Sequence, residues 1–198
     1  MYKCALCKVR ACESGMNNIP SGCPGTGDMS EAKEAYLDDE NYELSKIAGV
    51  LAAQNDKTRI EEIMEFSGQN GFKKIGLVFC TSLSAEAEII EKIFTHNGFH
   101  VESVMCKVGG VSKELIGLEK SNKPMCNPIA QAGALNKAGT DINVIVGLCI
   151  GHDILFTKYS EAPVTVLAVK DRVLAHNPLG AVYLANTFYK SKLFPVNK

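Results

Sequence analysis

Strand-length apolar runs alternate with helical segments from residue 73 onward, and this alternation limits the fold more than any other feature. Four runs have the length and composition of strands: KIGLVFC, FHVESVMC, INVIVGLC and APVTVLAVKD. Helical patterns lie between or after them at 85–98, 128–138 and 179–190. Strands joined through helices pair in parallel, so this order predicts right-handed βαβ crossovers and a mostly parallel sheet covered on both faces.

We therefore predict a three-layer α/β domain at 71–198, Rossmann-like or flavodoxin-like, with a mostly parallel sheet of about four strands. Residues 31–70 show helical periodicity and are expected to form two extra helices that pack on this core. Residues 1–30 are rich in Cys, Gly, Pro, Ser and Asn and hold few large apolar side chains. Such a segment needs a staple or a neighbour in order to fold.

The composition is that of an ordinary globular chain, with 198 residues, 46% hydrophobic, 22% charged and a net charge of −1. This balance predicts no nucleic-acid partner. No apolar run has the length of a membrane span, and no apolar signal region opens the chain, so we expect a cytoplasmic protein without a membrane partner. In that compartment the eight cysteines are expected to be reduced and to bind metal rather than form a disulfide framework.

The first four cysteines form the pattern C-x2-C-x4-C-x10-C-P-G, at Cys4, Cys7, Cys12 and Cys23. The first two are spaced so that one tight turn aims both sulfurs at one metal ion. Four thiolates suit either tetrahedral zinc or an iron–sulfur cluster, of which a 4Fe–4S type is the expected form. The spacing therefore predicts a four-cysteine metal site but leaves the metal open.

The other four cysteines are scattered in sequence but not in their expected positions. Cys80, Cys106 and Cys149 end the first three strands, and parallel strands end at one edge of a sheet. Cys126 precedes a predicted helix with Asn127 as N-cap, Pro128 in the first turn and Gly139 as terminator. Its helix dipole favours a thiolate there. We therefore predict a second site at the carboxyl edge of the sheet, where open α/β sheets bind ligands.

Ionisable residues are expected at the same edge. The turn after the third strand contains His152 and Asp153, and the fourth strand ends in Lys170, Asp171 and Arg172. The segment HNPLGAVYLAN repeats the cap-and-proline device of CNPIAQAGALN, with His176 in place of Cys126. His152, Asp153 and His176 are thus candidate acids, bases or ligands. The competing interpretation is that the cysteines are small buried apolar residues and the histidines serve local turns.

Three chemistries suit this second set. The four thiols could hold a metal ion or cluster, or three could be ligands that leave a position open for substrate, with His152 or Asp153 as acid or base. Alternatively, Cys126 could act without metal as a nucleophile or redox thiol.

Five segments carry a resemblance that covers essentially the whole chain: CALCKVRAC with CPG, LVFC, MCNPIAQA, GLCIGHD and KDRVLAHNP. On these residues the chain resembles a prokaryotic family of uncharacterised proteins, a cysteine-rich domain of unknown function described as metal-binding. The resemblance implies metal binding through cysteine and implies no reaction.

The leading hypothesis is a metal–thiolate protein that performs redox or metal-dependent chemistry on a small molecule, with a small-molecule ligand or a redox protein as partner. One alternative is a non-enzymatic carrier of metal or cluster. Another is a ligand-binding α/β module with a structural zinc knuckle.

Overall fold

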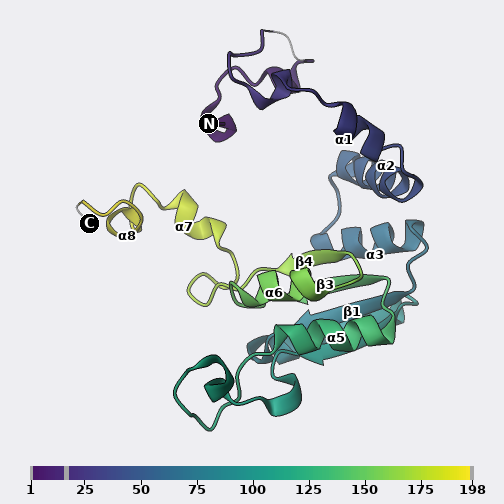
Figure 1. The fold of residues 1–198 in the computed structure, drawn as a ribbon, viewed down its shortest axis with the longest axis vertical. Coiled ribbons are helices and arrows are strands. Elements are labelled where there is room, and N and C mark those ends of the chain that lie inside the picture. The colour runs from purple at the N-terminus through teal and green to yellow at the C-terminus, as the bar shows by residue number, and fades with distance from the viewer. Residues whose placement is uncertain (1, 16–17, 197–198) are drawn as a thin grey trace. The chain divides into compact units, whose positions relative to one another are not determined.

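The structure, a computed structural model, describes residues 2–15 and 18–196 (Figure 1). The chain forms two compact units, residues 1–55 and residues 56–198. The three-part division expected from composition stays a prediction.

The second unit contains a four-stranded sheet in the order β2-β1-β3-β4. Its strands are β1 (Lys74–Phe79), β2 (His100–Met105), β3 (Ile142–Val146) and β4 (Val164–Ala168). Every neighbouring pair is parallel, with Phe79 opposite both Met105 and Val146 at the carboxyl end. The predicted α/β fold with a parallel sheet of about four strands is confirmed.

Helices cover both faces of this sheet. Alternate residues of β1 and β3 point to opposite faces, and the apolar side chains on each face are buried under helices. On one face, Leu77 and Val144 pack with side chains of α3 (Arg59–Gln69) and α4 (Ser84–His96). On the other face, Val78 and Ile145 pack with α5 (Pro128–Ala138) and α6 (His152–Tyr159) (Figure 1). The result is the expected three-layer core.

The ends of α5 follow the sequence signals closely. The Asn127 side chain accepts a hydrogen bond from the Ala130 N–H at 3.2 Å, Pro128 opens the helix, and Gly139 ends it in the left-handed conformation. In contrast, α6 has no counterpart among the predicted helices, since its first residues, His152 and Asp153, were expected in a turn. The fully buried Phe156 explains the difference, because its burial against the sheet holds these eight residues helical.

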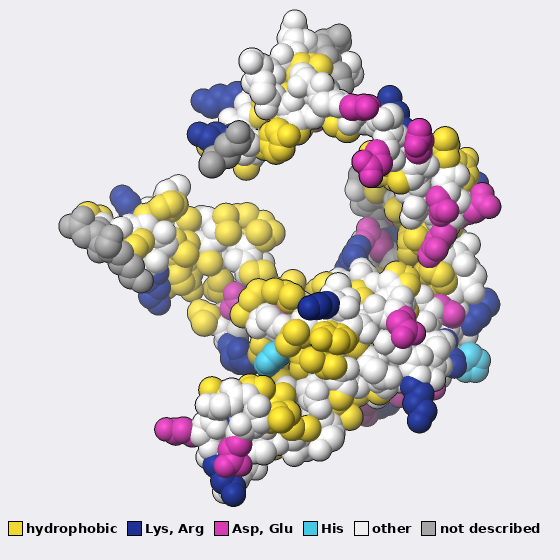
Figure 2. All heavy atoms as spheres, in the orientation of Figure 1, with side chains coloured by type: hydrophobic (Ala, Val, Ile, Leu, Met, Phe, Trp, Pro, Cys, Tyr) yellow, Lys and Arg dark blue, Asp and Glu magenta, His cyan; other side chains and the backbone are white. Residues whose placement is uncertain are grey.

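The helix predicted at 179–190 is shorter than expected. The segment forms α7 (Leu179–Tyr183) and, after a series of turns, α8 (Lys190–Leu193). Its large side chains are exposed, with Tyr183 at 74% and Phe188 at 73%, and Figure 2 shows apolar atoms gathered over it. A short helix without a buried face lacks the packing that would extend it.

The first unit contains α1 (Ser30–Ala35) and α2 (Asp39–Gln54), which follow three short 3-10 turns at Cys4–Leu6, Ala11–Glu13 and Pro24–Thr26. Ile47 and Leu51 are the buried residues of α2, on the face that the sequence pattern predicts. Before residue 30, Ala11 is the one buried residue among those described. This segment therefore has almost no apolar core of its own.

Across the described ranges, no helix combines the length and the apolar character that crossing a bilayer requires.

Candidate functional site

The four cysteines of the second set lie around the carboxyl ends of the strands. Cys80 and Cys106 directly follow β1 and β2, Cys149 comes three residues after β3, and Cys126 lies two residues before α5. From β1 the chain passes to β2 on one side, and from β3 it passes to β4 on the other side, so β1 and β3 flank the point where the strand order reverses. Ligands of open α/β sheets bind outside the strand ends at this switch point.

Cys106 and Cys126 are in direct contact, with their sulfur atoms 3.9 Å apart. The Asn127 N–H donates to the Cys106 carbonyl at 2.8 Å, which ties the start of α5 to the end of β2. The Thr81 N–H donates to the Cys106 sulfur at 3.4 Å. Cys80, Cys106 and Cys126 belong to the same packed cluster beneath α5, so the fold brings three thiols of the second set together.

Two cations that follow β4 reach the same edge. The Arg172 guanidinium donates to the Cys149 sulfur, with Nη2 and Sγ 3.1 Å apart. Lys170 donates through its ammonium group to the Ser82 hydroxyl, and the Cys80 sulfur lies 3.4 Å from that same oxygen. The charges that the sequence suggested at the end of the fourth strand thus lie beside the thiols of β1 and β3.

The surroundings of Cys80 favour its thiolate. Burial opposes ionisation, but hydrogen bonds from Ser82 and the positive charge of Lys170 outweigh it and lower the pKa of Cys80 from 9.0 to about 7. Cys80 is therefore half ionised near neutral pH in the metal-free protein.

Cys106 behaves in the opposite way. Burial raises its pKa from 9.0 to about 11, and the neighbouring Cys126 and Cys80 add to this shift, while the Thr81 N–H opposes it. The pKa of Arg172 is raised in turn, first by its hydrogen bond to Cys149 and then by the charges of Cys149, Cys80 and Cys126. All four thiols thus act electrostatically on one another or on one guanidinium.

Gly147, directly after β3, allows the loop after β3 to approach the loop after β1 closely, because it has no side chain. Its φ is +64°, and a Cβ there would lie 2.2 Å from Leu83 Cδ1 in the loop after β1. We expect Gly147→Ala to lower the free energy of unfolding by about 2 kcal/mol, through backbone strain and overpacking, as urea unfolding followed by circular dichroism would show. Gly133→Ala is the control: it lies on an exposed helical surface with no atom near the added Cβ and should be neutral or stabilising. A tolerated Gly147→Ala would contradict the tight contact between the two loops.

The candidate acids and bases have mainly backbone roles. The N–H groups of His152 and Asp153 both donate to the Cys149 carbonyl, at 2.9 and 3.1 Å, and so anchor Cys149 at the start of α6. The His176 Nδ1 accepts from the Asp171 N–H and lies 3.2 Å from the Val169 carbonyl. His176 thus stabilises a local turn, as the competing interpretation of the sequence expects. A catalytic role for His152, Asp153 or His176 stays a prediction.

Two polar residues at this edge were missed by the sequence interpretation. Ser82 links Cys80 to Lys170, and nothing in TSLSAE singles out one of its hydroxyls. Gln131 is fully buried on α5, donates to the Val104 carbonyl at 2.7 Å, and leaves its Oε1 without a partner among the described atoms. Its position one turn before the buried Leu135 was the available signal, because a polar residue on a buried helix face serves a specific contact.

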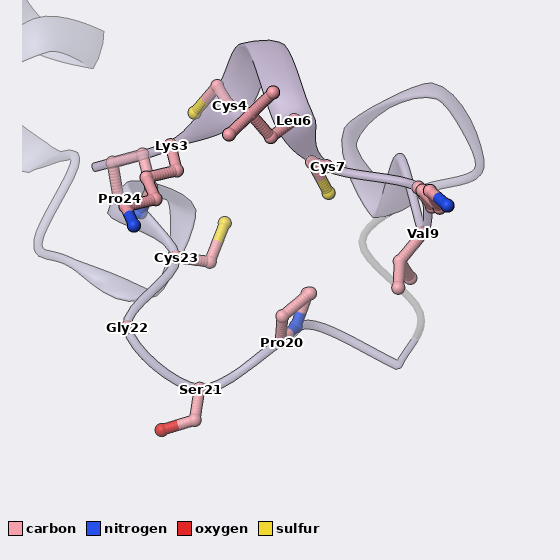
Figure 3. Close-up of a pocket in the computed structure, with 11 residues that line it drawn as sticks. Lys3, Cys4, Leu6, Cys7, Val9, Pro20, Ser21, Gly22, Cys23 and Pro24 are labelled. Atoms are coloured by element: carbon pink, nitrogen blue, oxygen red, sulfur yellow. The ribbon is translucent and has the colours of Figure 1, made fainter. Parts of the chain in front are cut away.

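Three of the four N-terminal cysteines line a pocket of the first unit. Cys4, Cys7 and Cys23 line an open pocket of about 450 Å³, and Figure 3 shows the Cys23 sulfur directed toward the turn that carries Cys4 and Cys7. Backbone N–H groups donate to two of these sulfurs, Arg10 to Cys7 at 3.5 Å and Gly25 to Cys23 at 3.4 Å. Cys12 is exposed and does not line this pocket.

In the part of the chain that the structure describes, no three side chains of His, Cys, Asp or Glu lie close enough together to hold a metal ion. Both cysteine sets would therefore need to draw their sulfurs inward to close around an ion.

Comparisons with known proteins place the chain in a family of unknown function. Residues 23–167 match the family described as "Protein of unknown function (DUF1847)". The chain is also 45% identical over 198 residues to "Uncharacterized protein MJ0455" of Methanocaldococcus jannaschii, a match that covers 96% of this chain and 97% of that protein. The chain therefore belongs to the DUF1847 family, and the resemblance to an uncharacterised family is confirmed.

Proposed function

We propose that this member of the DUF1847 family is a metal–thiolate protein whose working site is the carboxyl edge of the sheet. Cys80, Cys106, Cys126 and Cys149 would bind a metal ion or an iron–sulfur cluster there, for redox or metal-dependent chemistry on a small molecule. The observation that supports the proposal is that all four cysteines follow strand ends or precede α5 at the carboxyl edge of a parallel sheet. Cys106 and Cys126 are in contact there, and Arg172 donates to Cys149.

The spacing of Cys106 and Cys126 suits metal ligation. Two sulfurs bound to one tetrahedral ion at about 2.3 Å each lie about 3.8 Å apart. The Cys106 and Cys126 sulfurs are separated by 3.9 Å, so this pair already has the spacing of two ligands of one ion. This distance suits two ligands of one metal atom, either a single ion or one iron of a 2Fe–2S cluster, because each cysteine of a 4Fe–4S cluster binds a different iron.

Hydrogen bonds to sulfur support the same chemistry. The Thr81 N–H and the Arg172 guanidinium donate to Cys106 and Cys149, and such donors stabilise bound thiolates and tune the potential of a metal centre.

The N-terminal set would serve a different purpose. Of the residues described before position 30, only Ala11 is buried, so a metal ion held by Cys4, Cys7, Cys12 and Cys23 would supply the cross-link that the segment lacks. An electron relay is the alternative role for a cluster at this position.

A carrier function is the second candidate, and one observation favours it. Cys4 and Cys12 are exposed and the pocket beside Cys4 is open, so an ion bound there would be accessible to an acceptor. Rapid transfer of bound metal to a chelator from the folded chain would favour a carrier, whereas release only upon unfolding would favour a staple.

The test is anaerobic purification followed by loading with zinc or with ferrous iron and sulfide, with metal content and visible absorbance measured per chain. We expect two loaded sites. Cys126→Ser with Cys149→Ser should remove the metal of the sheet edge and leave the other site occupied, and both residues are only half-buried, so the fold should survive.

Cys4→Ser with Cys7→Ser is the matched control and should show the reverse pattern. Circular dichroism verifies that each variant keeps its secondary structure. Colourless protein with eight titratable thiols and no bound metal would reject the proposal for both sets, and unchanged metal content in Cys126→Ser with Cys149→Ser would reject the sheet-edge site.

A further inference from the structure

The cysteine-lined edge also carries positive charge that its carboxylates do not neutralise. Lys170 and Arg172 take part in none of the ion pairs formed among residues 2–15 and 18–196. The nearest acidic residue in sequence, Asp171, accepts instead from the Val173 and Leu174 N–H groups at 2.9 and 2.8 Å. Likewise, the Asp153 carboxylate accepts from the Ile154 N–H.

Lys170 lies across the switch point itself. It hydrogen-bonds Ser82 in the loop after β1, and its Nζ would lie 3.9 Å from a Cβ on Gly147 at the end of β3. A single ammonium group therefore reaches both loops that border the switch point. Arg172 adds an exposed guanidinium on the β3 side, with Nη2 on the Cys149 sulfur.

Further donors face the same edge. The 13-residue helix α4 begins at Ser84, directly after the loop that holds Thr81 and Ser82, and its positive dipole end therefore lies beside Lys170. A guanidinium, an ammonium group and a helix N-terminus are the groups that bind carboxylates and phosphates in proteins.

We propose that the small molecule bound at this edge is an oxyanion, a carboxylate or a phosphate, held by Lys170 and Arg172 at the β1–β3 switch point beside the thiols. This inference rests on the proposed function in one respect, that the sheet edge is the working site. It adds the substrate class: the anionic group anchors the molecule on the two cations, and its remaining part extends toward Cys80 and Cys149.

The experiment measures binding of inorganic phosphate and of acetate to the full chain by calorimetry at low ionic strength, together with metal content. Saturable binding of at least one anion is expected, and comparison of the two identifies the oxyanion. Lys170→Gln and Arg172→Gln should each weaken it about tenfold or more, as loss of a charge-assisted hydrogen bond predicts. Lys158→Gln, an exposed lysine on α6, is the matched control and should bind as the unaltered chain does.

The outcomes separate this inference from the proposed function. Anion binding that depends on Lys170 and Arg172 supports the inference, even in a chain that binds no metal, which would reject the metal proposal alone. Absent binding, or equal binding in all variants, overturns the inference. Loss of metal in Arg172→Gln without any anion binding also overturns it, because the cations would then serve only as counter-charges to the metal–thiolate centre.

Discussion

Replacing Phe94 with alanine is expected to lower the free energy of unfolding by about 3–5 kcal/mol, the range for removal of a fully buried phenylalanine. Phe94 is 0% exposed at the end of α4 and packs with β1 and β3 residues in the core on that face. Its ring also meets Phe99 edge-on, with centroids 6.4 Å apart. Urea unfolding followed by circular dichroism would measure the loss.

Phe94 is chosen because α4 connects β1 to β2 and its N-terminus borders the candidate site. Phe194→Ala is the matched control, since this phenylalanine is 59% exposed and should change stability by less than about 0.5 kcal/mol. Similar losses in the two variants would contradict the packing of α4 against the sheet.

In the metal-free protein, Cys80 and Cys106 are expected to make opposite contributions to the pH dependence of stability. The pKa of Cys80 falls from 9.0 to about 7 on folding, so between pH 7 and 9 the unfolded chain holds a proton that the folded one has lost. Stability therefore rises with pH across this window and is lost as pH falls through 7. At 1.36 kcal/mol for each pKa unit, the rise is about 3 kcal/mol.

Cys106 reverses the trend at higher pH. Its pKa rises from 9.0 to about 11 on folding, so between pH 9 and 11 the folded chain holds the extra proton. Stability therefore decreases as pH rises through this window, by a similar amount. Loading the thiolates with metal should abolish both effects, because bound thiolates no longer titrate there.

Chemical denaturation at several pH values, on the unaltered chain and on Cys80→Ala and Cys106→Ala, would isolate the two contributions. Lysines and tyrosines titrate in the same way in all three chains, so their contributions cancel when the free energies of unfolding are subtracted. The free energy of unfolding of the unaltered chain minus that of Cys80→Ala should grow between pH 7 and 9. The same difference for Cys106→Ala should shrink between pH 9 and 11. A flat Cys80 difference would show that Ser82 and Lys170 do not stabilise the thiolate.

Local signals in the sequence were sufficient for much of the fold. The apolar runs at β1 to β4, with helical patterns between them, specify parallel strands because such connections must cross a sheet face. The cap and terminator of α5 were read correctly, since Asn127 and Gly139 act through their own backbone neighbours. The prediction failed at α6 and α7, where burial decides helix length. The buried Phe156 packs on the sheet and stabilises α6, whereas the exposed residues around Tyr183 make no core contact that would lengthen α7.

For the candidate site, too, local sequence signals predicted one part and the tertiary structure decided the rest. The sequence by itself determined that Cys80, Cys106 and Cys149 follow successive strands and lie at one edge, because parallel strands end together. Only the tertiary structure decided which side chains meet there: Cys106 with Cys126, Ser82 with Lys170, and Cys149 with Arg172. These pairs join residues that are distant in the chain. Their contacts depend on the strand order, on the register and on the close approach at Gly147, none of which a local pattern of residues encodes.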